Sequence, residues 1–277
     1  MNLTERHIEH DGMRTTYLEA GNGPPVVLIH GSGPGVSALA NWRGTLQSEL
    51  ATKYRLIAPD VVGFGTTTFP DGTTFNNASR LRQLTGFINA MNLKKVALVG
   101  NSMGGALALG LAYNNPQRIE RMVLMGTVGI SFPITEALDE VWGYEPSIKA
   151  MEGVMRHLAH DQSLVSDDLV KLRYEASMAP GVQERYASAF AAPRQRHLDD
   201  MALSEEQISS ITTPTLLVHG IHDHIVPLNQ TSLRIVRLMP DADLSIFGRV
   251  GHWTQIERAE DFQNLINMFF QPLLISD

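Results

Sequence analysis

The segment that most constrains this chain is Gly100-Asn-Ser-Met-Gly104, a G-x-S-x-G sequence. A buried apolar run, residues 95–99, precedes it, and a stretch of small apolar residues, 104–113, follows it. The same letters can form a plain Gly/Ser turn, but this strand–turn–helix context is the one in which the serine acts as a nucleophile. The glycines let the chain turn sharply and keep side chains away from the serine. The sequence therefore predicts a nucleophilic Ser102 at the carboxyl end of a central strand.

Apolar runs alternate with helical patterns along most of the chain. The runs predict strands at residues 15–19, 25–30, 54–58, 95–99, 121–125, 215–219 and 242–247. Helical spacing predicts helices at residues 42–50, 79–91, 104–113, 228–238 and 261–270. Continuous apolar strands that alternate with helices favour an α/β fold, with a mostly parallel central sheet covered by helices on both faces.

The alternation stops in the middle of the chain. Residues 132–208 contain no clean buried strand, and helical periodicity, charge and methionine dominate there. We therefore predict a helical lid at 132–208, inserted between a first core segment, 1–131, and a second, 209–277. The second core segment is expected to carry the acid and the base that activate the nucleophile.

Composition excludes several classes of function. The net charge is −7 without a run of like charges, so a basic footprint for nucleic acid is absent. The chain has no cysteine, which excludes disulfides, thiolate metal sites and a cysteine nucleophile. No stretch approaches the roughly 18 to 20 apolar residues of a membrane helix, and no apolar signal-peptide core follows the polar N-terminus. These features predict a cytoplasmic protein that acts without membrane, nucleic acid or cofactor.

A nucleophile of this kind needs donors for the negative oxygen that develops on attack. The backbone N–H of Met103 is the first candidate, because it follows the nucleophile. The loop His30-Gly-Ser-Gly-Pro-Gly35 follows an earlier strand, and we choose the N–H of Ser32 from it. A phosphate-binding loop is the other interpretation, but no Gly-Lys-Ser/Thr follows and the G-x-G-x-x-G spacing is missing.

The acid and the base are sought after the nucleophile, since α/β-hydrolases carry them in the order Ser, Asp or Glu, His. Asp223 lies in the loop after the strand at 215–219, where it can hold an imidazole in the right tautomer. Asp241 and Asp243 follow the next helix and are weaker candidates. His252 follows the last predicted strand and has the position of the general base.

A metal site near Asp223 is the alternative. His222 and His224 flank it, but two histidines at i and i+2 ligate zinc only if a further ligand converges. The triad order already explains Asp223, so no metal is predicted.

Several segments together resemble one family, the meta-cleavage-product hydrolases of aromatic degradation. The segments are His30-Gly-Ser-Gly-Pro-Gly35, Asn41-Trp42, Gly100-Asn-Ser-Met-Gly-Gly105, Val141-Trp-Gly-Tyr144, Leu172-Arg-Tyr-Glu-Ala-Ser177 and Gly251-His-Trp-Thr-Gln-Ile-Glu257. The likeness runs from about residue 30 to the C-terminus and is strongest to the enzymes for monocyclic substrates. It implies hydrolysis of a carbon–carbon bond in a 2-hydroxy-6-oxohexa-2,4-dienoate, a small-molecule partner.

The resemblance also implies residue roles. Arg173 would bind the dienoate carboxylate or 2-oxo group, a task that suits a planar guanidinium. Asn41 and Asn101 would hydrogen-bond the polar end of the substrate, beside Gly31. Trp253 would pack over the diene next to His252.

The pocket for the C6 substituent is expected to be apolar. Ile130, Phe132 and Leu138 are the candidates for its wall. Two departures from the family's pattern concern substrate size: His197 stands where a bulky aromatic is common, and the stretch at 65–70, Gly-Thr-Thr-Thr-Phe-Pro, is unusual.

The reaction that the resemblance implies has two stages. The dienol is first ketonised through His252, and the C6 carbonyl is then attacked with the help of Ser102. The resemblance also implies a homodimer or a larger homo-oligomer. Two other functions stay open, because a fold alone does not fix function: a carboxylesterase on the same scaffold, and a hydrolase-like receptor that binds a small molecule and barely turns it over.

Overall fold

The apolar runs of the sequence form the strands of one sheet in the computed structural model, which describes residues 3–274. The strands are β1 (Glu5–His10), β2 (Met13–Ala20), β3 (Pro25–Ile29), β4 (Arg55–Pro59), β5 (Val96–Asn101), β6 (Ile119–Met125), β7 (Thr215–Gly220) and β8 (Ala242–Phe247). Their order in the sheet is β1-β2-β4-β3-β5-β6-β7-β8. From β4 to β8 all neighbours are parallel, whereas β2 is antiparallel to both β1 and β4.

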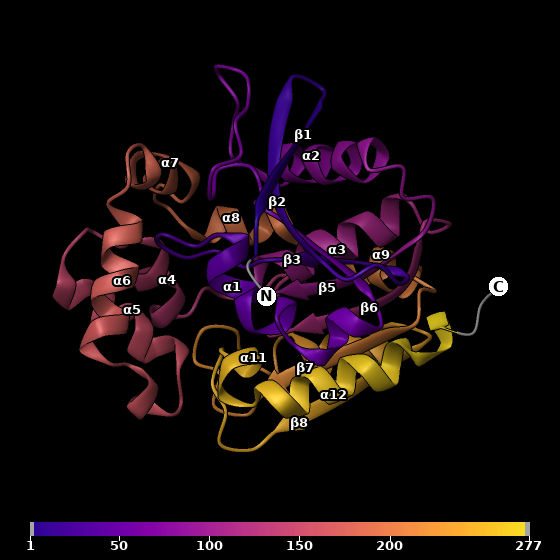
Figure 1. Ribbon diagram of the computed structural model, residues 1–277. Coiled ribbons are helices and arrows are strands. Elements are labelled where there is room, and N and C mark those ends of the chain that lie inside the picture. Colours follow the sequence, from indigo (N-terminus) through magenta and orange to yellow (C-terminus); the bar gives the residue numbers. More distant parts are fainter. Residues whose placement is uncertain (1–2, 275–277) are drawn as a thin grey trace.

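Helices cover both faces of this sheet (Figure 1). They are α1 (Ala38–Leu46), α2 (Asn77–Ala90), α3 (Met103–Asn114), α4 (Glu136–Trp142), α5 (Ile148–Leu158), α6 (Asp167–Ser177), α7 (Val182–Ala189), α8 (Gln195–Met201), α9 (Glu205–Ser209), α10 (Ser232–Leu238), α11 (Thr254–Glu257) and α12 (Ala259–Phe270). Three short 3₁₀ helices are η1 (Glu49–Thr52), η2 (Gln162–Leu164) and η3 (Gln271–Leu274).

Two apolar layers hold these helices on the sheet. One buried cluster joins α2, α3 and α10 to one face, and the other joins α1 and α12 to the opposite face. The strands from β3 to β7 are buried on both faces, as expected for a parallel sheet between two helical layers. The predicted α/β architecture is therefore confirmed.

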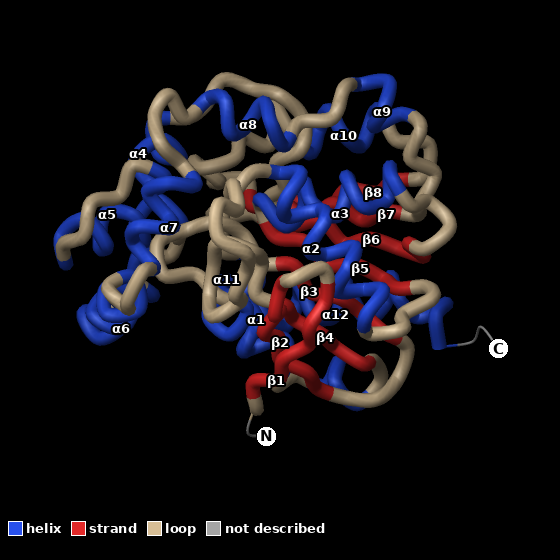
Figure 2. Tube along the Cα trace, turned by 90° about the horizontal axis from the view of Figure 1, so that it is seen from above, coloured by secondary structure: helices blue, strands red, loops and turns tan. Residues whose placement is uncertain are grey.

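Helices α4 to α7 lie together at one end of the molecule, beside the sheet rather than over its faces (Figures 1 and 2). They belong to the predicted lid at 132–208. Helices α8 and α9 of the same segment return along α3. The division into two core segments and a lid stays a prediction, and residues 1, 2 and 275–277 of the two core segments lie outside the described residues.

Two helix starts predicted from periodicity are wrong. Helix α1 begins at Ala38, four residues early, because the Ser37 side chain accepts a hydrogen bond from Ala40 N and caps it. Residues 49 and 50, predicted as the end of that helix, belong to the separate helix η1. Helix α10 begins at Ser232 rather than at 228, because the amides of Gln230 and Thr231 both donate to the carbonyl of Pro227 and form a turn.

The sequence prediction also missed β1. This strand is polar and largely exposed, and among the described strands it pairs only with β2, at the edge of the sheet. A buried apolar run, the signal used for the other strands, is absent from such an edge strand.

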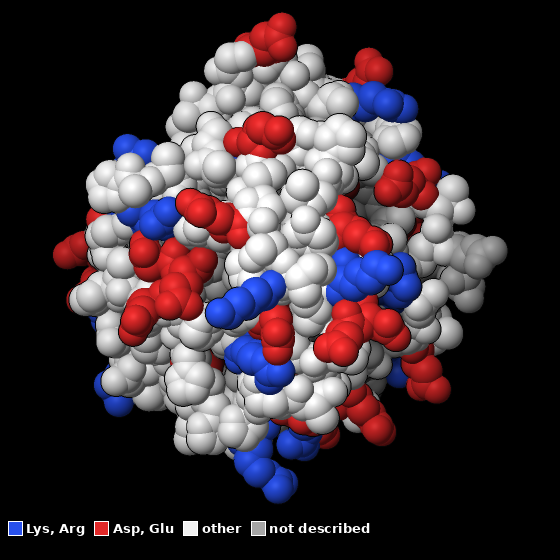
Figure 3. Space-filling view, turned by 90° about the vertical axis from the view of Figure 1, so that its left-hand side faces the viewer, with Lys and Arg blue, Asp and Glu red and all other residues white. Residues whose placement is uncertain are grey.

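The face formed by the α4–α7 end carries acidic and basic side chains side by side (Figure 3). Charges of both signs are interspersed there, without a broad area of one sign. Within residues 3–274, no helix combines the length and the apolar character needed to cross a bilayer.

Candidate active site

Ser102 lies at the sharp turn between β5 and α3. Its backbone φ is 53°, a region that non-glycine residues rarely adopt, and such strain is concentrated at functional sites. The turn requires the following glycine, because a Cβ on Gly104 would lie 2.1 Å from the carbonyl oxygen of Ile29. The strand–turn–helix context predicted for the G-x-S-x-G sequence is therefore confirmed.

His252 and Asp223 form a buried pair at the carboxyl ends of β8 and β7. His252 Nδ1 lies 2.7 Å from Asp223 Oδ2. The other carboxylate oxygen, Oδ1, accepts the amides of Ile225 and Val226, each at 2.9 Å. These bonds fix the carboxylate, which in turn fixes the orientation of the imidazole.

The environment keeps Asp223 ionised. Burial on its own raises the pKa of Asp223, but the charge of His252 and hydrogen bonds from His219 and His252 outweigh it. The net effect holds the pKa well below its usual range. A carboxylate that is ionised and fully enclosed can stabilise an imidazolium formed during a reaction.

The structure separates the candidate acids. Asp241 and Asp243 lie at the amino end of β8, whereas Asp223 follows the carboxyl end of the parallel strand β7. Asp241 and Asp243 therefore lie at the amino ends of the parallel strands, whereas Ser102 lies at their carboxyl ends. The choice of Asp223 from the order of the chain agrees with this placement.

Two backbone N–H groups near Ser102 are free to donate. Within residues 3–274, neither the Ser32 amide nor the Met103 amide has a hydrogen-bond partner. The loop that carries Ser32 is held by two contacts: Gly31 N donates to Asn41 Oδ1 at 3.4 Å, and Trp142 Nε1 donates to Ser32 Oγ at 2.9 Å. The second contact comes from α4 and was not predicted.

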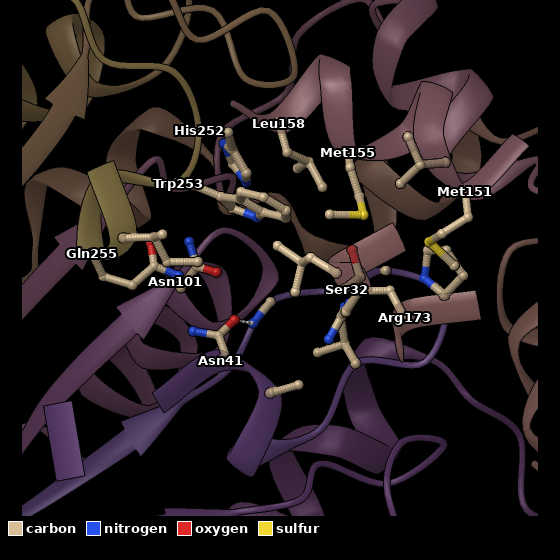
Figure 4. Close-up of a pocket in the computed structure, with 18 residues that line it drawn as sticks. Ser32, Asn41, Asn101, Met151, Met155, Leu158, Arg173, His252, Trp253 and Gln255 are labelled. Carbon is tan, nitrogen blue, oxygen red and sulfur yellow. Dashed lines mark hydrogen bonds between the residues drawn. The ribbon is translucent and has the colours of Figure 1, made fainter. Parts of the chain in front are cut away.

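One pocket is bounded by this loop, the His252 segment and helices α5 and α6 (Figure 4). The predicted residues Gly31, Ser32, Asn41, Asn101, Arg173, His252 and Trp253 all line it. In Figure 4, Asn41 and Asn101 lie on one side of the pocket and Arg173 on the other. The structure therefore brings the predicted substrate-binding residues together around a single space.

Ser102 sits behind the wall of this pocket. A Cβ built on the lining residue Gly31 would lie 3.2 Å from Ser102 Cβ. Within the described residues no hydrogen bond joins Ser102 to His252. Catalytic hydrogen bonds of this kind are often long without substrate and tighten in the reacting complex.

Arg173, on α6, has no hydrogen-bond or ion-pair partner within residues 3–274. Burial lowers the pKa of its guanidinium to about 10, which still leaves it charged at neutral pH. Taking a charge out of water without a partner is unfavourable, so the group is suited to an anion that enters the pocket.

Some lining residues were missed by the sequence prediction. The apolar part of the wall consists of Met151, Val154, Met155, Leu158, Leu169 and Ile256. By contrast, Ile130, Phe132 and Leu138 are buried in the main core cluster and are absent from this lining. The helical pattern of α5 could have identified its lining residues, because this helix has one strongly apolar face.

Gln255 was also missed. It follows Trp253 on α11, is only 7% exposed, and lines the pocket, and its Oε1 has no hydrogen-bond partner within residues 3–274. Buried amides without partners are rare in native proteins. Its position two residues after the predicted site residue Trp253 could have indicated that Gln255 lies at the same pocket.

The structure also shows where the sequence features that were singled out above lie. His197 packs edge-on against Trp142 and Phe190. The threonine-rich stretch at 65–70 folds around Asp60, whose carboxylate accepts the Thr66 amide at 2.9 Å. His222 stacks on His160 at a ring distance of 4.3 Å. Within residues 3–274 no three His, Asp or Glu side chains gather as metal ligands.

His30, which begins the loop of Ser32, makes the fold sensitive to acid. Its Nε2 accepts the amide of Val61 at 2.9 Å, so the buried ring must stay neutral at that atom. Desolvation by burial lowers the pKa of His30 to about 4 from 6.5. Between these values the unfolded chain binds a proton that the folded chain does not, so acid favours unfolding.

We expect this histidine to remove about 2 kcal/mol of unfolding free energy between pH 7 and pH 5. The measurement is urea unfolding at both values for wild type and His30→Gln, since glutamine can still accept from Val61. His197→Gln is the comparison: desolvation also lowers the pKa of His197, but this side chain is only partly buried, so its removal should abolish a smaller share of the pH dependence than His30→Gln. An equal pH dependence in wild type and His30→Gln would contradict the prediction.

The sequence relatives agree with this geometry. The model of the alpha/beta hydrolase fold family matches residues 24–259. The chain is 51% identical over 258 residues to the 2-hydroxy-6-oxo-2,4-heptadienoate hydrolase of Pseudomonas putida, with 93% of each chain covered. It is 46% identical over 264 residues to the 2-hydroxymuconate semialdehyde hydrolase of a Pseudomonas species, with 95% of this chain and 93% of the relative covered.

A solved structure is similarly close. CumD, a meta-cleavage product hydrolase from Pseudomonas fluorescens, was solved as a Ser-to-Ala mutant complexed with acetates. Its TM-score to this chain is 0.94 at 47% identity, and the match covers 96% of this chain and 97% of that chain. This chain is a meta-cleavage product hydrolase. The family expected from the sequence motifs is confirmed, and so is its membership of the α/β hydrolases.

The pocket of this meta-cleavage product hydrolase contains Arg173, which has no partner within residues 3–274. The two curated relatives are both named for unsaturated keto acids or semialdehydes. The roles of the individual residues in this meta-cleavage product hydrolase are proposals, which follow from the geometry described above.

Proposed function

We propose that this meta-cleavage product hydrolase cleaves the C5–C6 bond of 2-hydroxy-6-oxohexa-2,4-dienoates formed by ring cleavage of monocyclic aromatics. The products are a 2-hydroxypenta-2,4-dienoate and a carboxylic acid. The names of the relatives at 51% and 46% identity support this substrate class. The first name describes a seven-carbon chain and the second a six-carbon chain.

The observation that carries the proposal is Arg173. A simple ester has no anionic group to pair with a cation in the pocket, whereas the dienoate has a carboxylate. The guanidinium of Arg173 is partly buried and has no partner within residues 3–274, and it can bind a carboxylate through two parallel hydrogen bonds. Asn41 offers a further donor, because its Nδ2 is buried without a partner.

We assign Ser102, His252 and Asp223 as the catalytic triad. The 2.7 Å contact between His252 and Asp223 supports the roles of base and orienting acid. The amides of Ser32 and Met103 would hold the oxyanion, since both are free to donate and flank the nucleophile. Trp253 would position the diene beside His252, which precedes it in the chain.

The reaction would run in two stages. First, the proton of the 2-hydroxyl leaves and a proton is delivered to C5, with His252 as the relay, so the dienol becomes a 2-oxo enone. The new carbonyl can then receive the electron pair of the C5–C6 bond. After Ser102 or a water that it assists adds to C6, that bond breaks, and one water is consumed to release the acid.

We further propose that residues 132–208 act as the lid of this site, because Met151, Leu158 and Arg173 of that segment line the pocket. We also propose a homodimer or larger homo-oligomer, on the family resemblance, and a cytoplasmic location, which the lack of cysteine fits.

The first experiment follows the loss of the yellow absorbance of 2-hydroxy-6-oxohepta-2,4-dienoate, beside a p-nitrophenyl acetate control. We expect rapid bleaching by wild type. Arg173→Gln should lower kcat/KM for the dienoate by about 10²- to 10³-fold, because hydrogen bonds to a charged group each contribute ~1.5–3 kcal/mol. Hydrolysis of the neutral ester should change less than about 3-fold, since it has no carboxylate to bind.

The other functions predict different results. Brisk ester hydrolysis without bleaching would identify a carboxylesterase. Tight dienoate binding without steady turnover would identify a receptor. Equal losses on both substrates in Arg173→Gln would contradict the role of Arg173 in carboxylate binding.

A further inference from the structure

Glu257, at the end of α11, binds two separate parts of the active-site wall through backbone amides. Its Oε1 accepts the amide of Gly251 at 2.8 Å, directly before His252. Its Oε2 accepts the amides of His160 at 2.9 Å and Asp161 at 2.8 Å, just beyond the end of α5. One carboxylate therefore bridges the segment of the general base and the segment that follows a lid helix.

The same two segments also touch directly. The carbonyl of Leu158, the last residue of α5, accepts the amides of His252 at 2.8 Å and Trp253 at 3.2 Å. The fit is close, since a Cβ on Gly251 would lie 2.8 Å from both His160 N and Leu158 O. Leu158 lines the pocket, so the pocket wall and the base share one set of backbone contacts.

Within the described residues, three backbone amides are the partners of the Glu257 carboxylate. Within residues 3–274 the Glu257 carboxylate forms no ion pair, and every hydrogen bond that it accepts comes from a backbone amide. Bonds to an ionised acceptor are roughly twice as strong as bonds between neutral groups. A carboxylate is also the side-chain group that can accept all three amides with two oxygens.

We propose that Glu257 is a positioning residue, which fixes His252 relative to the α5 wall of the substrate pocket. This inference rests on the proposed function for its kinetic consequence. Proton transfer to C5 and attack at C6 both require the imidazole at a set distance from a substrate held by the pocket wall. A misplacement of about 1 Å at a catalytic centre can lower the rate ~10²-fold.

The test compares Glu257→Gln and Glu257→Asp with the control Glu260→Gln, whose side chain is exposed at the start of α12. Glutamine keeps one acceptor oxygen, and aspartate keeps the charge but is one methylene shorter, so neither can make all three bonds. We expect kcat for the dienoate to fall by about 10- to 100-fold in both variants, with a smaller change in KM. Glu260→Gln should behave as wild type.

Hydrogen exchange gives the readout that is independent of turnover. Peptides that cover 159–161 and 250–253 should both exchange faster in the Glu257 variants, and together, because one carboxylate protects both. Wild-type kcat in variants that are folded at the assay temperature would overturn the proposal. Faster exchange in only one of the two peptides would overturn it as well, because a bridge affects both ends.

The wild-type protein provides a measurement if the variants do not fold. The amides of His160, Asp161 and Gly251 should then show matching protection from exchange, since they open as one unit. Protection that differs by more than about tenfold would contradict the bridge. If wild type fails to cleave the dienoate at all, the proposed function fails, and the exchange results still decide whether Glu257 joins the two segments.

Discussion

Replacing Ser102 by alanine is expected to lower kcat for dienoate hydrolysis by about 10⁴-fold or more, with little change in substrate binding. The side chain lies at the strained turn between β5 and α3, and alanine removes the hydroxyl that would attack the substrate. Pocket contacts and the free amides of Ser32 and Met103 stay intact, so some catalysis over water will persist. The measurement is release of the carboxylic acid product, because the ketonisation step alone could change the absorbance.

Ser210→Ala, on the surface at the end of α9, is the matched control and should keep wild-type activity. The dissociation constant of the Ser102→Ala protein for the dienoate, measured by absorbance titration, should stay within a few fold of the wild-type KM. A variant that retains more than about 1% of wild-type kcat would show that Ser102 is not the nucleophile.

Asp223→Asn is expected to lower kcat by about 10⁴-fold while leaving the backbone in place. The asparagine oxygen can still accept the amides of Ile225 and Val226. Its amide nitrogen, however, would face His252 Nδ1 with a donor, which forces the wrong tautomer and removes the charge that stabilises the imidazolium. The measurement is kcat for the dienoate, with circular dichroism to verify the fold.

Asp241→Asn and Asp243→Asn are the controls that the sequence itself suggests. Both residues lie at the amino end of β8, away from Ser102. Their variants should therefore keep kcat within about 2-fold, as surface changes usually do. A large loss in either variant, together with an active Asp223→Asn, would reverse the assignment of the acid.

Much of the fold and of the candidate site could be predicted from the sequence, because local sequence patterns determine them. The G-x-S-x-G turn and the fully buried strands leave clear patterns, and strand order fixes where Asp223 and His252 must lie. The edge strand β1 and the start of α1 were missed, since the first has no apolar run and the second depends on a serine cap.

Contacts between distant segments could not be predicted in this way. The hydrogen bond from Trp142 to Ser32 joins residues 110 positions apart, and the bridge from Glu257 to His160 spans 97. Neither leaves a periodic pattern in the sequence. The lining residue Leu158 is similar, because its place in the pocket depends on how α5 docks against the His252 segment.

The unpartnered cation of Arg173 has a consequence for protein engineering. A residue chosen for the stability of the empty protein would not be a partly buried arginine, because the charge loses part of its water and has no partner within residues 3–274 until an anion arrives. Search methods that score only the unliganded fold would therefore select against Arg173, the proposed counter-ion of the substrate. Thermostabilised versions of the enzyme should be designed with Arg173 held fixed, or with an anion placed in the pocket.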